Sequence, residues 1–124
     1  MGARLGLWSA EVCDQLSTYL KPQESGNHTG VRWARVYDDA GVGLLFEAVE
    51  TPMEFSALLW TTYEIDGADT QADLPPIRKT VVRPALMRRG VGGDDSWGAR
   101  THPEYLLPRT DLIFRFAVTA CRMQ

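Results

Sequence analysis

The chain has 124 residues, of which 44% are hydrophobic and 23% charged, and its formal net charge at pH 7 is −3. These values are ordinary for a globular protein, so we expect a single domain over residues 1–124. The acidic balance excludes the basic footprint of a nucleic-acid or anionic-membrane partner, and no apolar run approaches the length of a membrane span. The first residues also lack a secretory signal, so we expect a cytoplasmic protein.

The N-terminal third carries an ambiguous pattern. Four apolar residues recur there at every fourth position, which is a weak helix signal: Trp8, Val12, Leu16 and Leu20. A polar segment follows, and its plain interpretation is a strand end and a turn. Three of its side chains could instead bind the hydroxyl groups of a ligand: Gln23, Glu24 and Asn27.

Strand patterns dominate the rest of the chain. Alternating apolar residues and strand-forming residue types predict strands at 31–37, 43–49, 53–60, 78–88 and 112–120. Asp38–Gly43 is typical of a hairpin turn, and Pro84 favours an edge or bulged strand. A short helix is expected over residues 62–69, where a Thr precedes acidic residues and Gly67 limits the length. Several strands with almost no helix predict an all-β antiparallel sandwich.

Residues 90–108 form the most unusual stretch of the sequence. Four glycines, two prolines, the adjacent carboxylates Asp94 and Asp95, Trp97 and His102 share this segment. No regular element tolerates that composition. Loops of this length are usually functional or disordered, and the aromatic and charged content argues against disorder. We therefore expect a long shaped loop that presents Trp97 near its tip.

The polar residues of this loop offer two kinds of chemistry. Glycoside hydrolysis uses two carboxylates that flank the scissile bond, but neighbouring side chains such as Asp94 and Asp95 point in different directions. The plainer interpretation is that both accept amide hydrogen bonds and shape the turn. A metal site built on these two residues and His102 is the alternative, although hard cations require more oxygen ligands. Neither His28 nor His102 accompanies a nucleophile motif, so both are expected to be hydrogen-bonded structural residues.

The aromatic and sulfur-containing residues allow further predictions. Trp97 either packs its face on a sugar ring or folds back onto the core, and the composition leaves both open. Three other tryptophans lie in candidate strands or periodic segments and are expected in the core: Trp8, Trp33 and Trp60. Cys13 and Cys121 lack the spacing of a metal or redox motif, and without a signal sequence we expect no disulfide between them.

Four ordered blocks of the sequence carry a resemblance. The blocks are Tyr19–Asn27 with Val31–Trp33, Gly43–Leu45, Phe55–Leu58 with Thr61 and Thr62, and Gly90–Ala99 with His102–Leu107. Together they resemble the C-terminal region of the large bacterial β-galactosidases of glycoside hydrolase family two, over about residues 8–118. The chain departs from the family pattern at Arg88 and Arg89, where an apolar residue is common, and at Ser25 and His28.

The resemblance implies a fold and an activity. It implies part of a galactose-mutarotase-like β-sandwich that lacks its first portion, with a strand around Trp8–Val12. It implies that Trp97 forms a platform for substrate in an enzyme that hydrolyses terminal β-galactosides such as lactose with retention. Asp94, Asp95, Ser96 and His102 would then support the loop. The catalytic glutamates and the magnesium and sodium ligands lie in another domain of such enzymes. We therefore expect no cofactor in this chain and no activity from the chain alone.

The implied partners are a β-galactoside sugar and the rest of a β-galactosidase polypeptide or a large subunit. Exposed strand edges also favour a homo-oligomer. Two alternatives stay open. The first is a stand-alone carbohydrate-binding module that keeps Trp97 as its ligand platform, and the second is a structural or complementing interaction domain.

Overall fold

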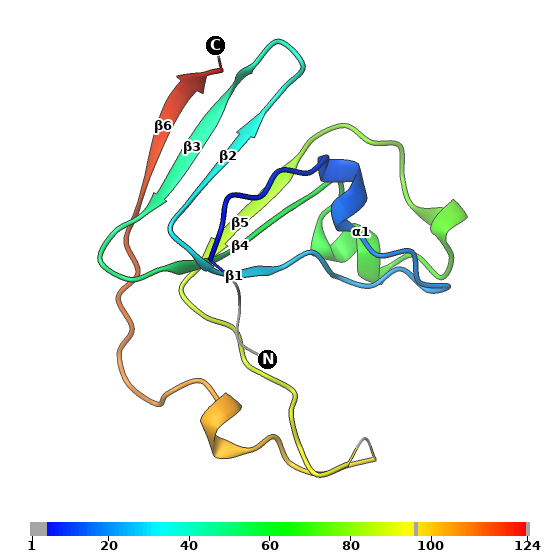
Figure 1. Ribbon diagram of the computed structural model, residues 1–124. Helices are drawn as coiled ribbons and strands as arrows, with labels where there is room; N and C mark the ends of the chain where they lie inside the picture. The colour runs from blue at the N-terminus through cyan, green and yellow to red at the C-terminus, as the bar shows by residue number, and fades with distance from the viewer. Residues whose placement is uncertain (1–4, 96, 124) are drawn as a thin grey trace.

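The structure is a computed structural model that describes residues 5–95 and 97–123 of the chain. Two antiparallel sheets of three strands each form the body of the molecule (Figure 1). The first sheet has the order β1-β4-β5, with β1 at His28–Val31, β4 at Met53–Leu58 and β5 at Val81–Ala85. The second has the order β2-β3-β6, with β2 at Trp33–Tyr37, β3 at Val42–Ala48 and β6 at Phe116–Arg122. The expectation of an all-β antiparallel sandwich is confirmed in part, because the fold is mostly β and sandwich-like, with one short helix.

The second sheet is built on a hairpin and a returning strand. β2 and β3 pair without a break from Trp33 opposite Glu47 to Tyr37 opposite Gly43. In the predicted turn, the Asp38 carboxylate accepts the amide hydrogens of Ala40 and Val42 at 3.0 and 2.9 Å. Gly41 has a backbone φ angle of 74°, which residues other than glycine rarely adopt. The turn therefore fixes the register of the hairpin. β6, from the far end of the chain, pairs with β3 and completes the sheet.

The core lies where the two sheets face each other. The ring of Phe46 on β3 meets the ring of Phe55 on β4, with centroids 5.4 Å apart. Met53 is fully buried beside them, and Ala34, Val36 and Val82 pack around this cluster. β4 is buried along nearly its whole length because it is the central strand of its sheet and lies under the other sheet. Burial of this strand holds the two layers together.

The chain changes sheets at Arg32. Residues 31–37 were expected to form one strand, but Val31 ends β1 in the first sheet and Trp33 begins β2 in the second. The Arg32 carbonyl accepts the amide hydrogen of Ala48 at 2.9 Å, so the crossing point is bonded to β3. The sequence pattern continues across the crossing, which is why β1 was not predicted as a separate strand.

The expectations for the N-terminal segment and for the tryptophans were partly wrong. The strand around Trp8–Val12 is absent from the described residues, and a 3-10 turn at Val12–Gln15 is the regular element there. Trp8 lies outside both sheets and is 79% exposed. Trp33 is 47% exposed because it lies on the face of β2 opposite to Ala34 and Val36, which pack toward the core. Trp60 is half-buried, and its indole N–H donates to the Pro75 carbonyl at 2.8 Å.

Other expected elements form with shifted bounds. The helix α1 spans Thr62–Asp66, and Thr61 and Glu64 form a reciprocal capping box at its start. β5 is an edge strand that contains Pro84, as predicted. β6 begins at Phe116 rather than at residue 112, and Phe114 ahead of it packs against the core. Cys13 and Cys121 are both free thiols in this structure.

The connection between β5 and β6 extends away from both sheets (Figure 1, yellow to orange). It contains a single 3-10 turn, Pro103–Tyr105, among its described residues. The prediction of a long loop over residues 90–108 is therefore confirmed apart from that turn. Within residues 5–95 and 97–123, no helix combines the length and the apolar composition that crossing a bilayer requires.

Candidate functional site

The long loop consists of two limbs that are bonded to each other. The Gly90 amide donates to the Tyr105 carbonyl at 2.8 Å, and the His102 amide donates to the Gly92 carbonyl at 2.9 Å. The Arg89 guanidinium also donates to the Thr101 hydroxyl at 3.1 Å. Backbone groups that would otherwise be left to solvent are thus paired across the loop. The loop is braced by its own contacts although it lies apart from the core.

Two glycines are required because Tyr105 lies against them. A Cβ atom placed on Gly90 would approach Tyr105 Cβ to 2.7 Å, and one on Gly92 would approach Tyr105 Cε2 to 2.7 Å. Both separations are shorter than carbon atoms tolerate without displacement. The glycines therefore serve a close approach of backbone to an aromatic ring. Tyr105 is the structural centre of the loop base.

The tip of the loop is organised by Asp95. Its Oδ1 accepts the amide hydrogens of Trp97, Gly98 and Ala99 at 2.8, 3.1 and 3.1 Å. These bonds, those from Trp97 and Ala99 foremost, lower the pKa of the Asp95 carboxyl below its ordinary value of 3.8. The side chain of Trp97 is 94% exposed, so it does not fold back onto the core. The tip therefore presents a bare indole on a backbone held by a carboxylate.

Asp94 points the other way, toward the second limb. Its carboxylate lies 2.9 Å from His102 Nε2, and His102 Nδ1 lies 3.9 Å from the Glu104 carboxylate. Asp94 and Asp95 thus diverge, as neighbouring residues were expected to do. Within the described part of the chain, no three side chains of His, Cys, Asp or Glu gather as metal ligands would. Ser96, which was predicted to support the loop, lies outside the described residues.

An open hollow of about 640 Å³ lies between the two limbs. Its lining includes Arg89, Asp94, Arg100 and His102. These side chains present both signs of charge and several hydrogen-bond donors. Such a surface suits a polar molecule or a polar segment of another chain.

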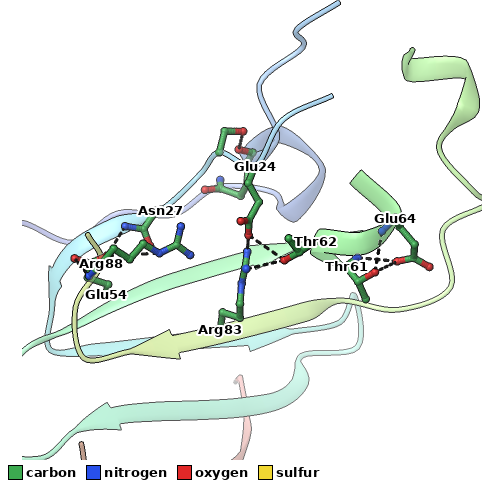
Figure 2. A network of polar contacts seen from close by, with 10 residues as sticks. Glu24, Asn27, Glu54, Thr61, Thr62, Glu64, Arg83 and Arg88 are labelled. Carbon is green, nitrogen blue, oxygen red and sulfur yellow. Dashed lines mark hydrogen bonds and ion pairs between the residues drawn. The ribbon is translucent and has the colours of Figure 1, made fainter. Parts of the chain in front are cut away.

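The polar segment of residues 21–27 serves the fold instead of a ligand at two of its three candidate positions. Figure 2 shows Glu24 directed at the Arg83 guanidinium, with which it forms an ion pair, and Asn27 directed at Glu54. Gln23 lines a smaller open hollow of about 360 Å³ beside α1. His28 is hydrogen-bonded as predicted, because its Nε2 lies 2.8 Å from Gln15 Oε1.

Comparison with known proteins decides the family. A family described as "Beta galactosidase small chain" matches residues 1–119. The chain belongs to the β-galactosidase small chain family. It is 45% identical over 118 residues to a β-galactosidase of Halalkalibacterium halodurans, and the aligned region covers 94% of this chain and 12% of that protein. It is also 33% identical over 115 residues to a β-galactosidase small subunit of Latilactobacillus sakei, which covers 84% of this chain and 36% of that protein.

The family assignment confirms the resemblance drawn from the four sequence blocks. A β-galactosidase of Streptococcus thermophilus gives the same result, with 44% identity over 110 residues, 89% of this chain and 11% of that protein. The chain spans about an eighth or less of these long relatives and about a third of the small subunit. It therefore corresponds to one region of a β-galactosidase.

Two residues that organise the loop were not singled out from the sequence. They are Tyr105, which packs on the loop glycines, and Glu54, which contacts Arg88 where the loop leaves β5. Arg88 itself was noted only as a departure from the family pattern. One signal for Tyr105 was the spacing of Gly90 and Gly92, which places two positions without side chains on the same side of an extended segment. For Glu54 the signal was a carboxylate within an otherwise apolar strand, which requires a partner.

Proposed function

We propose that the chain is the tryptophan-bearing region of a β-galactosidase, and that Trp97 packs on the galactosyl ring of the substrate. The exposed indole at the tip of the braced loop carries this proposal. A large aromatic side chain left 94% exposed on an otherwise self-bonded loop is suited to a partner outside the chain. Because the chain belongs to the β-galactosidase small chain family, we propose that this partner is the galactosyl ring of a β-galactoside.

The proposed contact works through the shape of the sugar. One face of a galactopyranose carries C–H groups, and an aromatic ring covers that face while leaving the hydroxyl groups to hydrogen-bonding partners. Holding the ring in one orientation places the glycosidic bond against catalytic groups and thereby lowers the barrier. Trp97 would thus be a binding residue that orients the substrate.

The catalytic carboxylates of the proposed reaction, hydrolysis of terminal β-galactosides such as lactose with retention, would come from outside this chain. Asp95 is bonded to three amides of its own loop, and Asp94 is bonded to His102. Because their carboxylate oxygens already accept these hydrogen bonds, the two residues are a poor fit to the magnesium and sodium sites that the family resemblance implies. Those ions would be held elsewhere. Asp94, Asp95 and His102 instead support the loop.

Two measurements test the proposal. The first is a calorimetric titration of the chain, free or joined to a β-galactosidase large subunit, with lactose. We expect Trp97→Ala to abolish binding and Trp33→Ala, which removes another exposed indole, to leave it unchanged. The second is hydrolysis of a chromogenic galactoside by the chain alone, for which we expect no turnover. Activity of the chain alone that survives repurification, or unchanged lactose binding by Trp97→Ala, would contradict the proposal.

The surface of the chain supports a large protein partner. Its accessible area is 9874 Å², whereas a folded monomer of 13.9 kDa exposes about 6,700 Å². Part of the excess lies on the inner face of the second sheet. Val118 sits directly opposite Phe46 on that face, yet it is 50% exposed. We propose that the rest of a β-galactosidase, including its large subunit, covers this face and completes a larger sandwich of the galactose-mutarotase-like kind.

Two alternative functions can be tested with the same purified chain. A stand-alone carbohydrate-binding module is favoured by the bracing of the Trp97 loop within the chain itself, and it predicts lactose binding without any large subunit. A structural or self-associating domain is favoured by β6, a seven-residue edge strand whose residues are almost all exposed. That alternative predicts a dimer or larger homo-oligomer in light scattering, and a strictly monomeric species at high concentration counts against it.

A further inference from the structure

Glu54 is a carboxylate placed inside an apolar strand. It follows the fully buried Met53 and precedes the buried Phe55 on β4, and its side chain is only 17% exposed. β4 is the central strand of its sheet, with β1 on one side and β5 on the other. A partly buried carboxylate at such a position destabilises the fold unless other groups satisfy its oxygens.

The oxygens of Glu54 are satisfied from both neighbouring strands. Asn27, which precedes β1, donates its side-chain amide to Oε2 at 2.8 Å. Arg88, which follows β5, donates its backbone amide to Oε1 at 3.2 Å, and its Nε lies 3.6 Å from Oε2. Figure 2 shows the three side chains converging at one end of the sheet. Glu54 therefore joins the flanks of both outer strands to the middle strand.

This end of the sheet is where the Trp97 loop begins. Arg88 lies two residues before Gly90, whose amide is bonded to Tyr105, and its neighbour Arg89 is bonded to Thr101 on the second limb. Glu54 thus holds Arg88, and the next two residues of the chain hold the second limb of the loop. We propose that Glu54 is a positioning residue that fixes the base of the loop on the sheet and so determines where Trp97 stands. The functional meaning of that position depends on the proposed sugar contact.

The same sheet offers a matched control. Glu24 and Arg83 form an ion pair there, and Arg83 Nη1 donates to the Thr62 hydroxyl at 2.9 Å (Figure 2). This pair also joins a flanking segment to β5, but its partners lie on α1 and the 21–27 segment instead of the loop base. Arg83→Gln therefore removes a comparable partly buried ion pair and leaves every hydrogen bond and ion pair of Glu54, Arg88 and Arg89 in place.

The test uses the full chain labelled with 5-fluorotryptophan, with the Trp97 fluorine signal assigned by Trp97→Phe. Amide hydrogen exchange at Gly90 reports the bond between the limbs. We expect Glu54→Ala to speed exchange at Gly90 by about tenfold or more, since a hydrogen bond to a charged group is lost. We also expect it to shift or broaden the Trp97 signal. Arg83→Gln should leave both readouts unchanged even if its melting temperature falls equally.

A rescue variant distinguishes positioning from general destabilisation. In Asn27→Asp/Glu54→Gln, the new carboxylate accepts from the Gln side-chain amide, and the Gln carbonyl oxygen still accepts from the Arg88 backbone amide. We expect exchange at Gly90 to be slower in this double variant than in Glu54→Gln alone, although Arg88 Nε no longer faces a carboxylate oxygen. If Glu54→Ala does not fold, the comparison of Glu54→Gln with this double variant decides the matter.

Two results would overturn the role of Glu54. One is a folded Glu54→Ala chain with unchanged Gly90 exchange and an unchanged Trp97 signal. The other is an equal change in Arg83→Gln, which would show a general loss of sheet stability. A separate lactose titration judges the sugar contact. Failure of the wild-type chain to bind lactose, free or with a large subunit, counts against the proposed function, while the exchange and fluorine data still judge Glu54.

Discussion

The contact between Gly92 and Tyr105 gives the sharpest prediction about the loop. In Gly92→Ala the new methyl group would lie 2.7 Å from Tyr105 Cε2 and 2.9 Å from Tyr105 Cδ2. The ring cannot remain in place, and the Gly92 carbonyl that accepts from His102 moves with its backbone. The change adds one methyl group to a packed contact and leaves every charge in place.

The expected size follows from overpacking. Inserting a methyl group into a well-packed core typically costs about 1–3 kcal/mol, and the lower end applies here because the atoms that it meets are the far end of the half-exposed Tyr105 side chain. Because the loop lies apart from the sheets, we expect this penalty in local opening and not in global unfolding. Exchange of the His102 amide should then accelerate by roughly fivefold, while the urea midpoint of the whole chain stays unchanged. Hydrogen exchange followed by nuclear magnetic resonance measures both loop limbs residue by residue.

A double-mutant cycle tests the reasoning. Tyr105→Ala removes the ring that the methyl group meets, so Gly92→Ala should have little further effect in that background. Equal effects of Gly92→Ala with and without the Tyr105 ring would refute the clash as the cause. They would point instead to a change in the backbone freedom of the loop.

Three further predictions concern other parts of the chain. Because the pKa of the Asp95 carboxyl is lowered, its hydrogen bonds to the loop amides should persist above pH 3.8 and be lost only as the pH falls further, through the folded-state pKa. The amide chemical shifts of Gly98 and Ala99 in a pH titration report this loss, and its occurrence at neutral pH would contradict the prediction. Met53→Ala should lower the free energy of unfolding by about 2–5 kcal/mol in urea, and a loss below about 1 kcal/mol would contradict the packing described. Val118→Asp should change the stability of the isolated chain by less than about 1 kcal/mol but weaken large-subunit binding more than about tenfold, and unchanged binding would exclude this face as the interface.

The fold was predictable where local chemistry decides it. The alternation in β2 and β3, the Asp38 turn and the capping residues of α1 each act within a few residues, and each of these elements formed, although α1 and β2 are shorter than expected. The prediction failed where long-range packing decides. β1 depends on pairing with β4, and the N-terminal periodicity produced only a 3-10 turn. Tertiary contacts that override local pattern are invisible in a single sequence.

The loop was predictable in outline but not in its internal contacts. Its glycines, prolines and two adjacent carboxylates indicated a shaped loop with Trp97 near the tip, and Trp97 is indeed exposed there. Which glycine meets Tyr105, and which carboxylate faces His102 or the tip amides, depends on how the two limbs align. That alignment is set by contacts ten or more residues apart, such as Gly90 with Tyr105. Local pattern carries no information about such pairs.

The arrangement of the loop bears on the proposed function, in which the chain would contribute Trp97 to a site whose catalytic groups lie elsewhere. A loop ordered only by its partner would lose conformational entropy on each association, and that loss would weaken the contact. Here the tip is held by Asp95, the limbs by Tyr105 and the base by Glu54, all within the chain. Trp97 is therefore presented by the chain itself, so that the proposed packing against a sugar would require little further ordering of the loop.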